Sequence, residues 1–257
     1  MGVYTTEIAS DKIPSDNPIH QRLLKAYYIA QDYVQGDLLE IGCGEGRGIA
    51  LLKGQVDSFT AIDKIDEVVE RLSKAYPEAT FIQDNIPPLN KLEDAQFDVV
   101  VTFQVIEHIK DDRQFLEEIR RVLKPGGKAL ITTPNIKKTL TRNPWHIREY
   151  TADELAALAG EVFDTVDMKG ITGNEKIWEY YHKNKKAVEK ITRFDVFDLQ
   201  HKLPSSLLKI PYDLLNRLNR NKLQTTNDDL VKQISHEDYL LTDEADDALD
   251  LFCIVKK

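Results

Sequence analysis

The sequence predicts an α/β protein with a doubly wound, mainly parallel seven-stranded sheet and a helical insertion before the last strand. Between residues 38 and 171, short apolar runs alternate with amphipathic stretches, which is the rhythm of successive β-α-β units. A glycine-rich corner follows the first apolar run, at the edge where an open parallel sheet binds its ligands. Residues 172–248 break the rhythm and are first helical, aromatic and basic, then acidic.

The first half of the fold has clear local signals. Apolar residues at helical spacing over 19–34 predict a helix ahead of the glycine corner. Gly54 and Pro77 mark the ends of the next two helices. Strands are expected at "LLEI", "SFTAID" and "ATFIQD".

The second half continues the alternation and then closes the sheet. The stretch "DDRQFLEEIRRVLKPGG" has one apolar face and a Lys-Pro-Gly-Gly exit, and Thr151 and Glu154 have capping-box spacing. The remaining strands are expected at "FDVVVTF", "KALITT", "EVFDTVDMKGI" and "LDLFCIVKK". We expect the last two to form a closing antiparallel pair.

Composition indicates a cytoplasmic protein of ordinary globular type, with 42% hydrophobic and 30% charged residues. No apolar run approaches the roughly 18 residues of a spanning helix, and no signal peptide is expected. Cys43 and Cys253 cannot form a disulfide framework, so two reduced thiols are expected. Gly2 and Thr6 fit a loose myristoylation pattern that often matches by chance. A net charge of −9 weighs against sequence-independent nucleic-acid binding.

The corner "LLEIGCGEGRG" favours a nucleotide-like ligand. Gly42, Gly44 and Gly46 have no Cβ, which permits a ligand to approach the backbone directly. Asp63 ends the next strand, 21 residues after Gly42, and an acid at that spacing can accept both hydroxyls of a ribose. Arg47 stands where a dinucleotide pattern has its third glycine, which disfavours a nicotinamide oxidoreductase.

Residues 36–160 resemble the class I S-adenosylmethionine-dependent methyltransferases, in particular the ubiquinone-biosynthesis-like small-molecule group. Five segments occur in the family's order: "LLEIGCGEG", "FTAID", "FIQDNIPPL", "FDVVVTFQVIEHI" and "LKPGGKALITTPN". The resemblance implies a Rossmann-like fold with S-adenosyl-L-methionine as the cofactor. It divides the chain into a cofactor-binding domain, 1–171 plus 249–257, and a lid or substrate insertion, 172–248.

The same resemblance implies the cofactor contacts. Those to the methionine part are Glu40, Gly42, Cys43, Gly44 and Gly46. Those to the ribose and adenine are Asp63, Lys64, Asp84, Asn85 and Ile86. Gln104 and Val105 are implied to face the methionine and the sulfonium.

Two segments are candidates for the chemistry, because methyl transfer to a hydroxyl needs positioning and benefits from a base. Glu107 and His108 in "IEHI" follow the fourth strand, and His108 is the candidate base. The alternative is that the pair hydrogen-bonds the loop and caps the next helix. Some quinone-type O-methyltransferases of the family resemble enzymes that bind a metal at this position with acidic residues and His. Here Gln104 stands where a further acidic ligand would help, so we expect no metal.

The second segment is "NPWHIREYT", residues 143–151, in a loop expected over the pocket. It resembles segments of ubiquinone-biosynthesis-like methyltransferases and of relatives that act on sugars and lipids. His146 is a further catalytic candidate, and Trp145, Arg148 and Tyr150 are candidate substrate contacts. The alternative is an ordered loop whose Arg and Glu pair with each other.

The insertion is expected to set substrate specificity. Its candidates for an apolar wall are Trp178, Tyr180, Tyr181, Phe194 and Phe197, with Trp178 and Tyr181 as substrate contacts. Nearby Lys and Arg could meet an anionic group on the substrate. The alternatives are aromatic residues that only pack on the sheet, or a basic amphipathic helix that contacts a membrane surface.

These patterns predict a methyltransferase acting on a small molecule, with a hydroxyl oxygen of a quinone-, phenol-, lipid- or sugar-like substrate as the acceptor. The Asn/Asp-Pro-Pro-aromatic signature of amino-group methylation on nucleic-acid bases is absent. At its place, the end of the fourth strand, the sequence reads "FQVIEH". Two alternatives stay open: a cofactor-binding protein without catalysis, and a protein-modifying methyltransferase.

Overall fold

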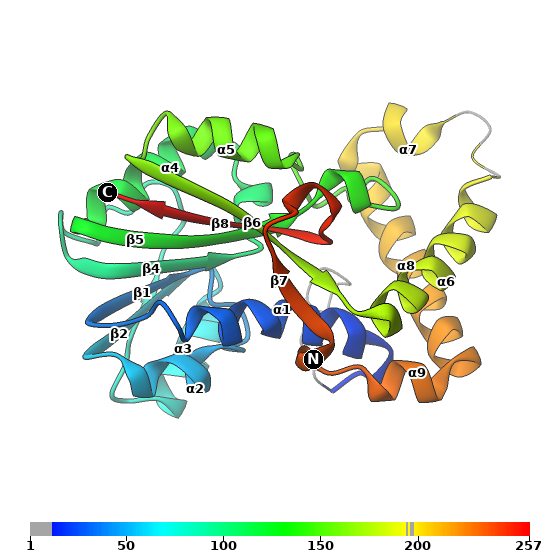
Figure 1. Cartoon of the computed structure of the whole chain (residues 1–257), viewed down its shortest axis with the longest axis horizontal. Coiled ribbons are helices and arrows are strands. Elements are labelled where there is room, and N and C mark those ends of the chain that lie inside the picture. Colours follow the sequence, from blue (N-terminus) through cyan, green and yellow to red (C-terminus); the bar gives the residue numbers. More distant parts are fainter. Residues whose placement is uncertain (1–11, 194, 196–197) are drawn as a thin grey trace.

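The computed structural model describes residues 12–193, 195 and 198–257, and one eight-stranded sheet organises them (Figure 1). The strands are β1 Asp37–Ile41, β2 Ser58–Asp63, β3 Thr80–Gln83, β4 Phe97–Phe103, β5 Leu123–Pro134, β6 Thr165–Gly173, β7 Tyr239–Thr242 and β8 Asp250–Lys256. Their order across the sheet is β3-β2-β1-β4-β5-β8-β6-β7. Strands β1 to β5 pair in parallel, and β6, β7 and β8 pair antiparallel with their neighbours.

Helices cover both faces of this sheet, as predicted for a doubly wound fold (Figure 1). The α-helices are α1 Asn17–Ala30, α2 Ile49–Leu52, α3 Asp66–Ala75, α4 Asp112–Val122, α5 Ala152–Gly160, α6 Glu175–Thr192, α7 Leu199–Lys202, α8 Ser205–Thr226 and α9 Asp228–Gln233. Thr151 and Glu154 form the predicted capping box at the start of α5.

The prediction of seven strands is wrong by one, because β7 lies inside the segment that we expected to be helical. Residues Tyr239–Thr242 pair with Gly170–Gly173 at the sheet edge. This strand is short and lies among acidic residues, so its local pattern is weak. The helices therefore precede β7 and not the last strand, while the predicted antiparallel pairing of β6 with β8 is confirmed.

The core has two layers because successive strand residues face opposite sides of the sheet. Val100 and its same-face neighbours pack against α4 and α5, where Phe115 and Ile119 are fully buried. Val99 and Val101 face the other layer, which α1, α2 and α3 complete. Strands buried on both faces read as continuous apolar runs, as "FDVVVTF" does.

The helices α6, α7, α8 and α9 gather beyond the carboxyl ends of the parallel strands, at the right of Figure 1. Buried Asp16, next to α1, fastens α8 by ion pairs to Arg217 and Arg220, at 2.7 and 3.1 Å. The Asn17 amide donates to the carbonyls of Val231 and Ile234. The segment thus packs against the start of α1, and its role as a lid stays a prediction.

Some expectations fall on residues outside this description. Gly2 and Thr6 of the lipidation pattern, and Phe194 and Phe197 of the proposed apolar wall, lie outside the described residues. Among the helices that are described, none combines the length and apolarity needed to cross a membrane.

The packing of Phe115 makes a test of the α4 layer. Because its ring is fully buried, Phe115→Ala should lower the free energy of unfolding by about 3–5 kcal/mol, measured by urea denaturation. Leu207→Ala on α8 is the control: Leu207 is exposed, so its replacement should change that free energy by less than about 0.5 kcal/mol. Equal losses in both variants would contradict this description of the core.

Candidate active site

The corner after β1 requires glycine at two positions for different reasons. Gly42 has φ +76°, and a Cβ there would lie only 2.4 Å from Cγ2 of Val105. Gly44 has φ +49°, but a Cβ there would meet no heavy atom within 4 Å. Both positions need the left-handed backbone that glycine adopts easily. Gly44 in addition leaves its backbone open toward whatever binds in front of it.

Asp63 fixes this corner and keeps capacity for a ligand. Its carboxylate is buried and accepts hydrogen bonds from the backbone N–H of Gly44, at 2.8 Å, and of Ile65, at 3.0 Å. A carboxylate offers about four acceptor sites, so two backbone donors do not exhaust it. The chain therefore holds an acceptor at the end of β2, next to the open backbone of Gly44.

Glu40, two residues before Gly42, is a buried carboxyl with an unsatisfied oxygen. The hydroxyl of Tyr27 donates to its Oε1 at 2.7 Å, while Oε2 has no hydrogen-bond partner among the described residues. Burial raises the pKa of Glu40 to about 7. An unpaired buried acceptor of this kind is costly.

A cavity of about 520 Å³ runs from this corner to the space beneath the helices. The expected cofactor residues that line it are Gly42, Gly44, Asp63, Lys64, Asn85, Ile86, Gln104 and Val105. A chamber of this size and position fits a nucleotide-like group with room for a second molecule. The donors and acceptors at its mouth therefore fit S-adenosylmethionine.

Four residues predicted to bind the cofactor do not line the cavity: Glu40, Cys43, Gly46 and Asp84. Cys43 is buried in the layer beneath α1, where burial raises the pKa of its thiol. Gly46 packs against Leu72 and Ile49. Asp84 accepts a hydrogen bond from the backbone N–H of Asn85. These residues shape the corner from behind, and their contact with a cofactor stays a prediction.

Gln104 ends β4 with a strained backbone. Its φ of +59° is uncommon for a residue with a side chain. Its backbone N–H donates to the Thr132 carbonyl at 2.9 Å, and its Nε2 donates to the Thr132 hydroxyl at 3.3 Å. Neighbouring structure thus holds an unfavourable conformation at the cavity wall, a pattern that clusters at functional sites.

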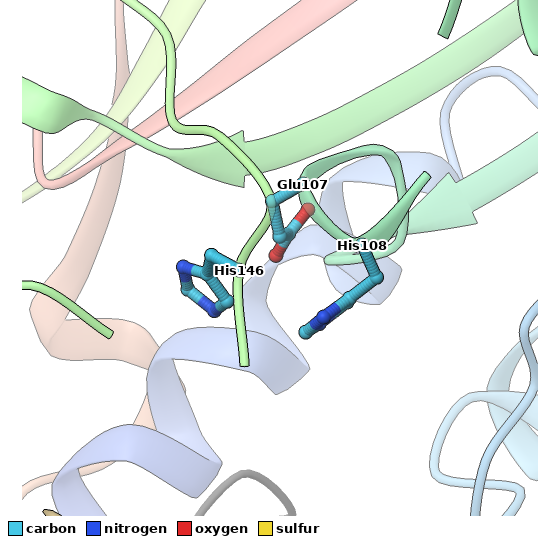
Figure 2. Close-up of side chains that lie close together, drawn as sticks. All are labelled: Glu107, His108 and His146. Atoms are coloured by element: carbon cyan, nitrogen blue, oxygen red, sulfur yellow. The ribbon is translucent and has the colours of Figure 1, made fainter. Parts of the chain in front are cut away.

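The structure joins the two segments that carry the candidate chemistry (Figure 2). Glu107 and His108 lie in a 3₁₀ turn after β4, and the Ile147 N–H of the 143–151 loop donates to the Glu107 carbonyl at 2.8 Å. The rings of His108 and His146 meet edge to face, with centroids 5.0 Å apart. The two segments therefore form one wall of the cavity.

His108 has a defined protonation state. Its Nδ1 lies 3.0 Å from the carbonyl oxygen of Trp145. Because a carbonyl only accepts, Nδ1 carries the proton and Nε2 is the basic nitrogen. Burial lowers the pKa of His108 to about 4, because the charged ring is poorly solvated there. His108 is therefore a neutral imidazole at physiological pH.

His146 is held on both sides. Its Nδ1 lies 2.6 Å from Oε1 of Glu149, and its Nε2 lies 2.7 Å from Nδ2 of Asn143. The Trp145 N–H donates to Oδ1 of Asn143, which turns the amide nitrogen toward His146. Nε2 is therefore an acceptor and Nδ1 donates to Glu149. His146 acts as a fixed part of the wall.

Glu107 is buried, and it lies between the two histidines and above them in the view of Figure 2. The Thr133 hydroxyl donates to its Oε2 at 3.0 Å, and burial raises the pKa of Glu107 to about 7. Glu107, His108 and His146 each offer an atom that could bind a metal, within 4.8 Å of one another. Both nitrogens of His146 already have hydrogen-bond partners, and the expectation of no metal stays a prediction.

Arg148 and Tyr150, predicted to contact substrate, instead anchor the 143–151 loop outside the cavity lining. Arg148 pairs with Oδ2 of Asp112 at 2.5 Å, and the Tyr150 hydroxyl donates to the same oxygen at 2.8 Å. The loop is ordered, as our alternative proposed, but Arg148 pairs with Asp112 while Glu149 pairs with His146.

The two tryptophans also lie outside the lining. Trp145 donates from Nε1 to Asp213 on α8, and Nζ of Lys209 lies 3.8 Å from its ring centroid. Trp178 packs edge-on against Tyr181 on α6. Tyr181 does line the cavity, and its hydroxyl donates to the Lys138 carbonyl at 3.1 Å.

Sequence reasoning missed most of the inner chamber. Its polar lining comes from three helices and comprises Arg22, Asn184, Tyr212, Asn216, Asn219 and Arg220. A periodic signal was present: Tyr180, Asn184 and Val188 recur every four residues along α6. Such a stripe of mixed polar and apolar residues on a helix also fits a partly exposed face, and only packing shows that it faces a cavity.

Comparisons with known proteins agree with this geometry. Residues 39–131 match the family described as "Methyltransferase domain". A "probable S-adenosylmethionine-dependent methyltransferase" of Mycobacterium tuberculosis is 40% identical over 48% of this chain and 46% of its own length. A ubiquinone biosynthesis O-methyltransferase of Rickettsia conorii is 29% identical over 51% of this chain and 45% of its own. The match thus spans about half the length of these relatives.

A solved structure confirms the fold over nearly the whole chain. An S-adenosylmethionine-dependent methyltransferase from Thermotoga maritima covers 93% of this chain and 92% of its own, with a TM-score of 0.56 and 14% identity. The resemblance to class I S-adenosylmethionine-dependent methyltransferases is confirmed, and S-adenosylmethionine is the cofactor that this family and fold indicate.

The position of Asp63 makes a test of the cofactor site. Because its carboxylate both fixes the Gly44 loop and faces the cavity, Asp63→Ala should weaken S-adenosylhomocysteine binding by more than about tenfold, measured by titration calorimetry. Asp66→Ala, at the exposed start of α3, should bind as the wild type does. Binding of NADH, or unchanged affinity in the Asp63 variant, would contradict the assignment.

The protonation of His108 can be measured directly. The ring resonances of His108 can be assigned by their loss in His108→Gln. In an NMR pH titration their midpoint should be about 4, because burial disfavours the charged ring. The imidazole then stays neutral at all higher pH. A midpoint of about 6.5, the ordinary pKa of histidine, would show that the ring is not buried as described.

Proposed function

We propose that the protein is an S-adenosylmethionine-dependent methyltransferase that methylates a hydroxyl oxygen of a small polar molecule. The observation that carries this proposal is the continuity of one cavity. The cavity begins at Gly44 and Asp63 and passes the imidazole of His108. It ends in a chamber lined by polar groups of α1, α6 and α8. A donor site and an acceptor site must share such a space.

The chain's own residues have distinct roles in this proposal. Gly44 and Asp63 would hold the ribose side of the cofactor, and Gln104 and Val105, which also line the cavity, would face its methionine part and the sulfonium. The cofactor supplies an activated methyl group on a sulfonium. What remains for the protein is to hold the acceptor oxygen in line and to exclude water, which supplies roughly 7–11 kcal/mol of barrier lowering.

His108 takes the proton of the acceptor. When the acceptor oxygen is methylated, its hydroxyl proton would pass to Nε2 of His108, because Nδ1 is already protonated toward Trp145. The pKa of about 4 makes His108 a weak base, so it accepts the proton only as the hydroxyl becomes acidic during transfer. Glu107 and His146 position the ring.

The inner chamber supports a polar acceptor. Asn184, Asn216 and Asn219 offer amide groups, and Arg22 and Arg220 offer guanidinium groups. This lining suits a phenol- or sugar-like molecule better than a wholly apolar chain. The name of the Rickettsia relative, an O-methyltransferase, supports oxygen as the acceptor atom.

The open alternatives differ in what they require of this cavity. A protein-modifying enzyme needs room for a peptide chain, whereas here α6 and α8 contribute walls on the acceptor side, which favours a small molecule. A cofactor-binding protein without catalysis needs no neutral imidazole beside the cofactor site. We therefore favour methylation of a small molecule over a protein-modifying enzyme and over a cofactor-binding protein without catalysis.

The test is turnover and its dependence on His108. Release of S-adenosylhomocysteine should be stimulated by one class within a panel of phenols, catechols and polyols. With that acceptor, His108→Gln should lower kcat by about 10²–10⁴-fold and leave S-adenosylhomocysteine affinity unchanged. His182→Gln, on the exposed side of α6, is the control. Full turnover by His108→Gln would remove its role as base, and no turnover with any hydroxyl compound would overturn the proposal.

A further inference from the structure

Helix α8 presents a continuous apolar face to solvent. Ile210 is 81% exposed, Leu207 is 62% and Leu214 is 59%, and Leu215 and Leu218 continue the same arc. We call these five residues the α8 stripe. At 100° per residue they fall on one side of the helix, with no charged residue among them. The stripe is a contiguous patch, and not a scatter of single exposed side chains.

The opposite face of α8 fixes the orientation of this stripe. Tyr212, Asn216 and Asn219 line the cavity, and Leu223 is buried. Two ion pairs to buried Asp16 and the Trp145–Asp213 hydrogen bond hold the helix against the rest of the protein. A rotation that buried the stripe would break these contacts, so its exposure follows from the packing. Contiguous apolar patches on a fixed surface mark interaction sites.

The charge around the stripe selects an anionic partner. Residues 175–226 contain eleven Lys or Arg and six Asp or Glu, although the whole chain has a net charge of −9. Lys185, Lys186 and Lys190 on α6 are exposed and have no ion-pair partner among the described residues. Lys222, one turn beyond Leu218, likewise has none there.

We propose that the α8 stripe docks the protein on an anionic lipid surface, with α8 lying in the plane of the interface. An exposed apolar face on a helix that belongs to a net basic segment is the pattern of an interfacial helix, and it does not require a spanning segment. Apolar side chains enter the boundary between headgroups and acyl chains, while the lysines meet anionic headgroups.

A second copy of the chain is a less suitable occupant. A two-fold dimer would place each stripe on its own counterpart, because such an interface uses the same patch on both subunits. Such a dimer would also bring together two copies of the net basic segment 175–226, which repel each other. A lipid surface covers the same apolar residues and attracts the same lysines.

Docking through α8 would couple the membrane surface to the cavity. Arg142, in the segment before the 143–151 loop, donates to the Ser205 hydroxyl at the start of α8 and to the carbonyls of Gln200 in α7 and of Leu203 between the two helices. Trp145 joins the loop to Asp213 on α8. The inference does not rest on the proposed function, because lipid binding can be measured without cofactor or acceptor.

The test is sedimentation of the full chain with sucrose-loaded vesicles. The protein should bind vesicles of equimolar phosphatidylcholine and phosphatidylglycerol, and should bind phosphatidylcholine alone more weakly. The triple variant Leu207→Ser, Ile210→Ser and Leu214→Ser should lower the partition coefficient by more than about tenfold. The matched control is Leu240→Ser with Leu241→Ser on β7, two other exposed leucines, and it should bind like the wild type.

Three results would overturn the inference. The first is wild-type protein that sediments with neither vesicle, and the second is a triple variant that binds as well as the β7 control. The third is a wild-type dimer in size-exclusion chromatography with light scattering that becomes a monomer in the triple variant, since a second copy would then cover the stripe. Circular dichroism should be unchanged in all variants, because every replaced side chain is exposed.

Discussion

The left-handed backbone at Gly42 and Gly44 is the constraint on which the site depends. It lets the chain leave β1 sharply enough for Val105, at the end of β4, to pack against Gly42. It also points the Gly44 N–H at Asp63, which ties the ends of β1 and β2 together. A side chain at Gly42 would both strain the turn and collide with Val105, and the cavity mouth would lose its shape.

Paired buried acids hold the rest of the site in place. Asp112 binds Arg148 and Tyr150, and so anchors the active-site loop at the start of α4. Asp16 binds Arg220 and Asp250 binds Arg22, and both arginines also line the cavity. Buried charges are costly unless they are paired, so each acid fixes its arginine strongly. The inner chamber therefore has preset positions for its cationic groups.

Much of the fold could be predicted because its signals are local. Alternating apolar runs and amphipathic stretches marked β1 to β6, and the glycine corner with Asp63 marked the candidate cofactor site. Strand β7 was missed because four residues give little pattern and their pairing with β6 is set by distant packing. Arg148 and Tyr150 were predicted to contact substrate because of their polar side chains. In the structure both side chains hydrogen-bond to buried Asp112 on α4, outside the cavity lining.

The sequence by itself determined the class of fold, and it singled out the candidate cofactor residues and the two segments with the candidate chemistry, because backbone preference and apolar periodicity act over a few residues. Only the tertiary structure decided which of these side chains face the cavity. The tautomer of His108 depends on the Trp145 carbonyl, 37 residues away in sequence, and the exposure of the α8 stripe depends on Asp16. Contacts between distant segments fix both, and no local pattern encodes them.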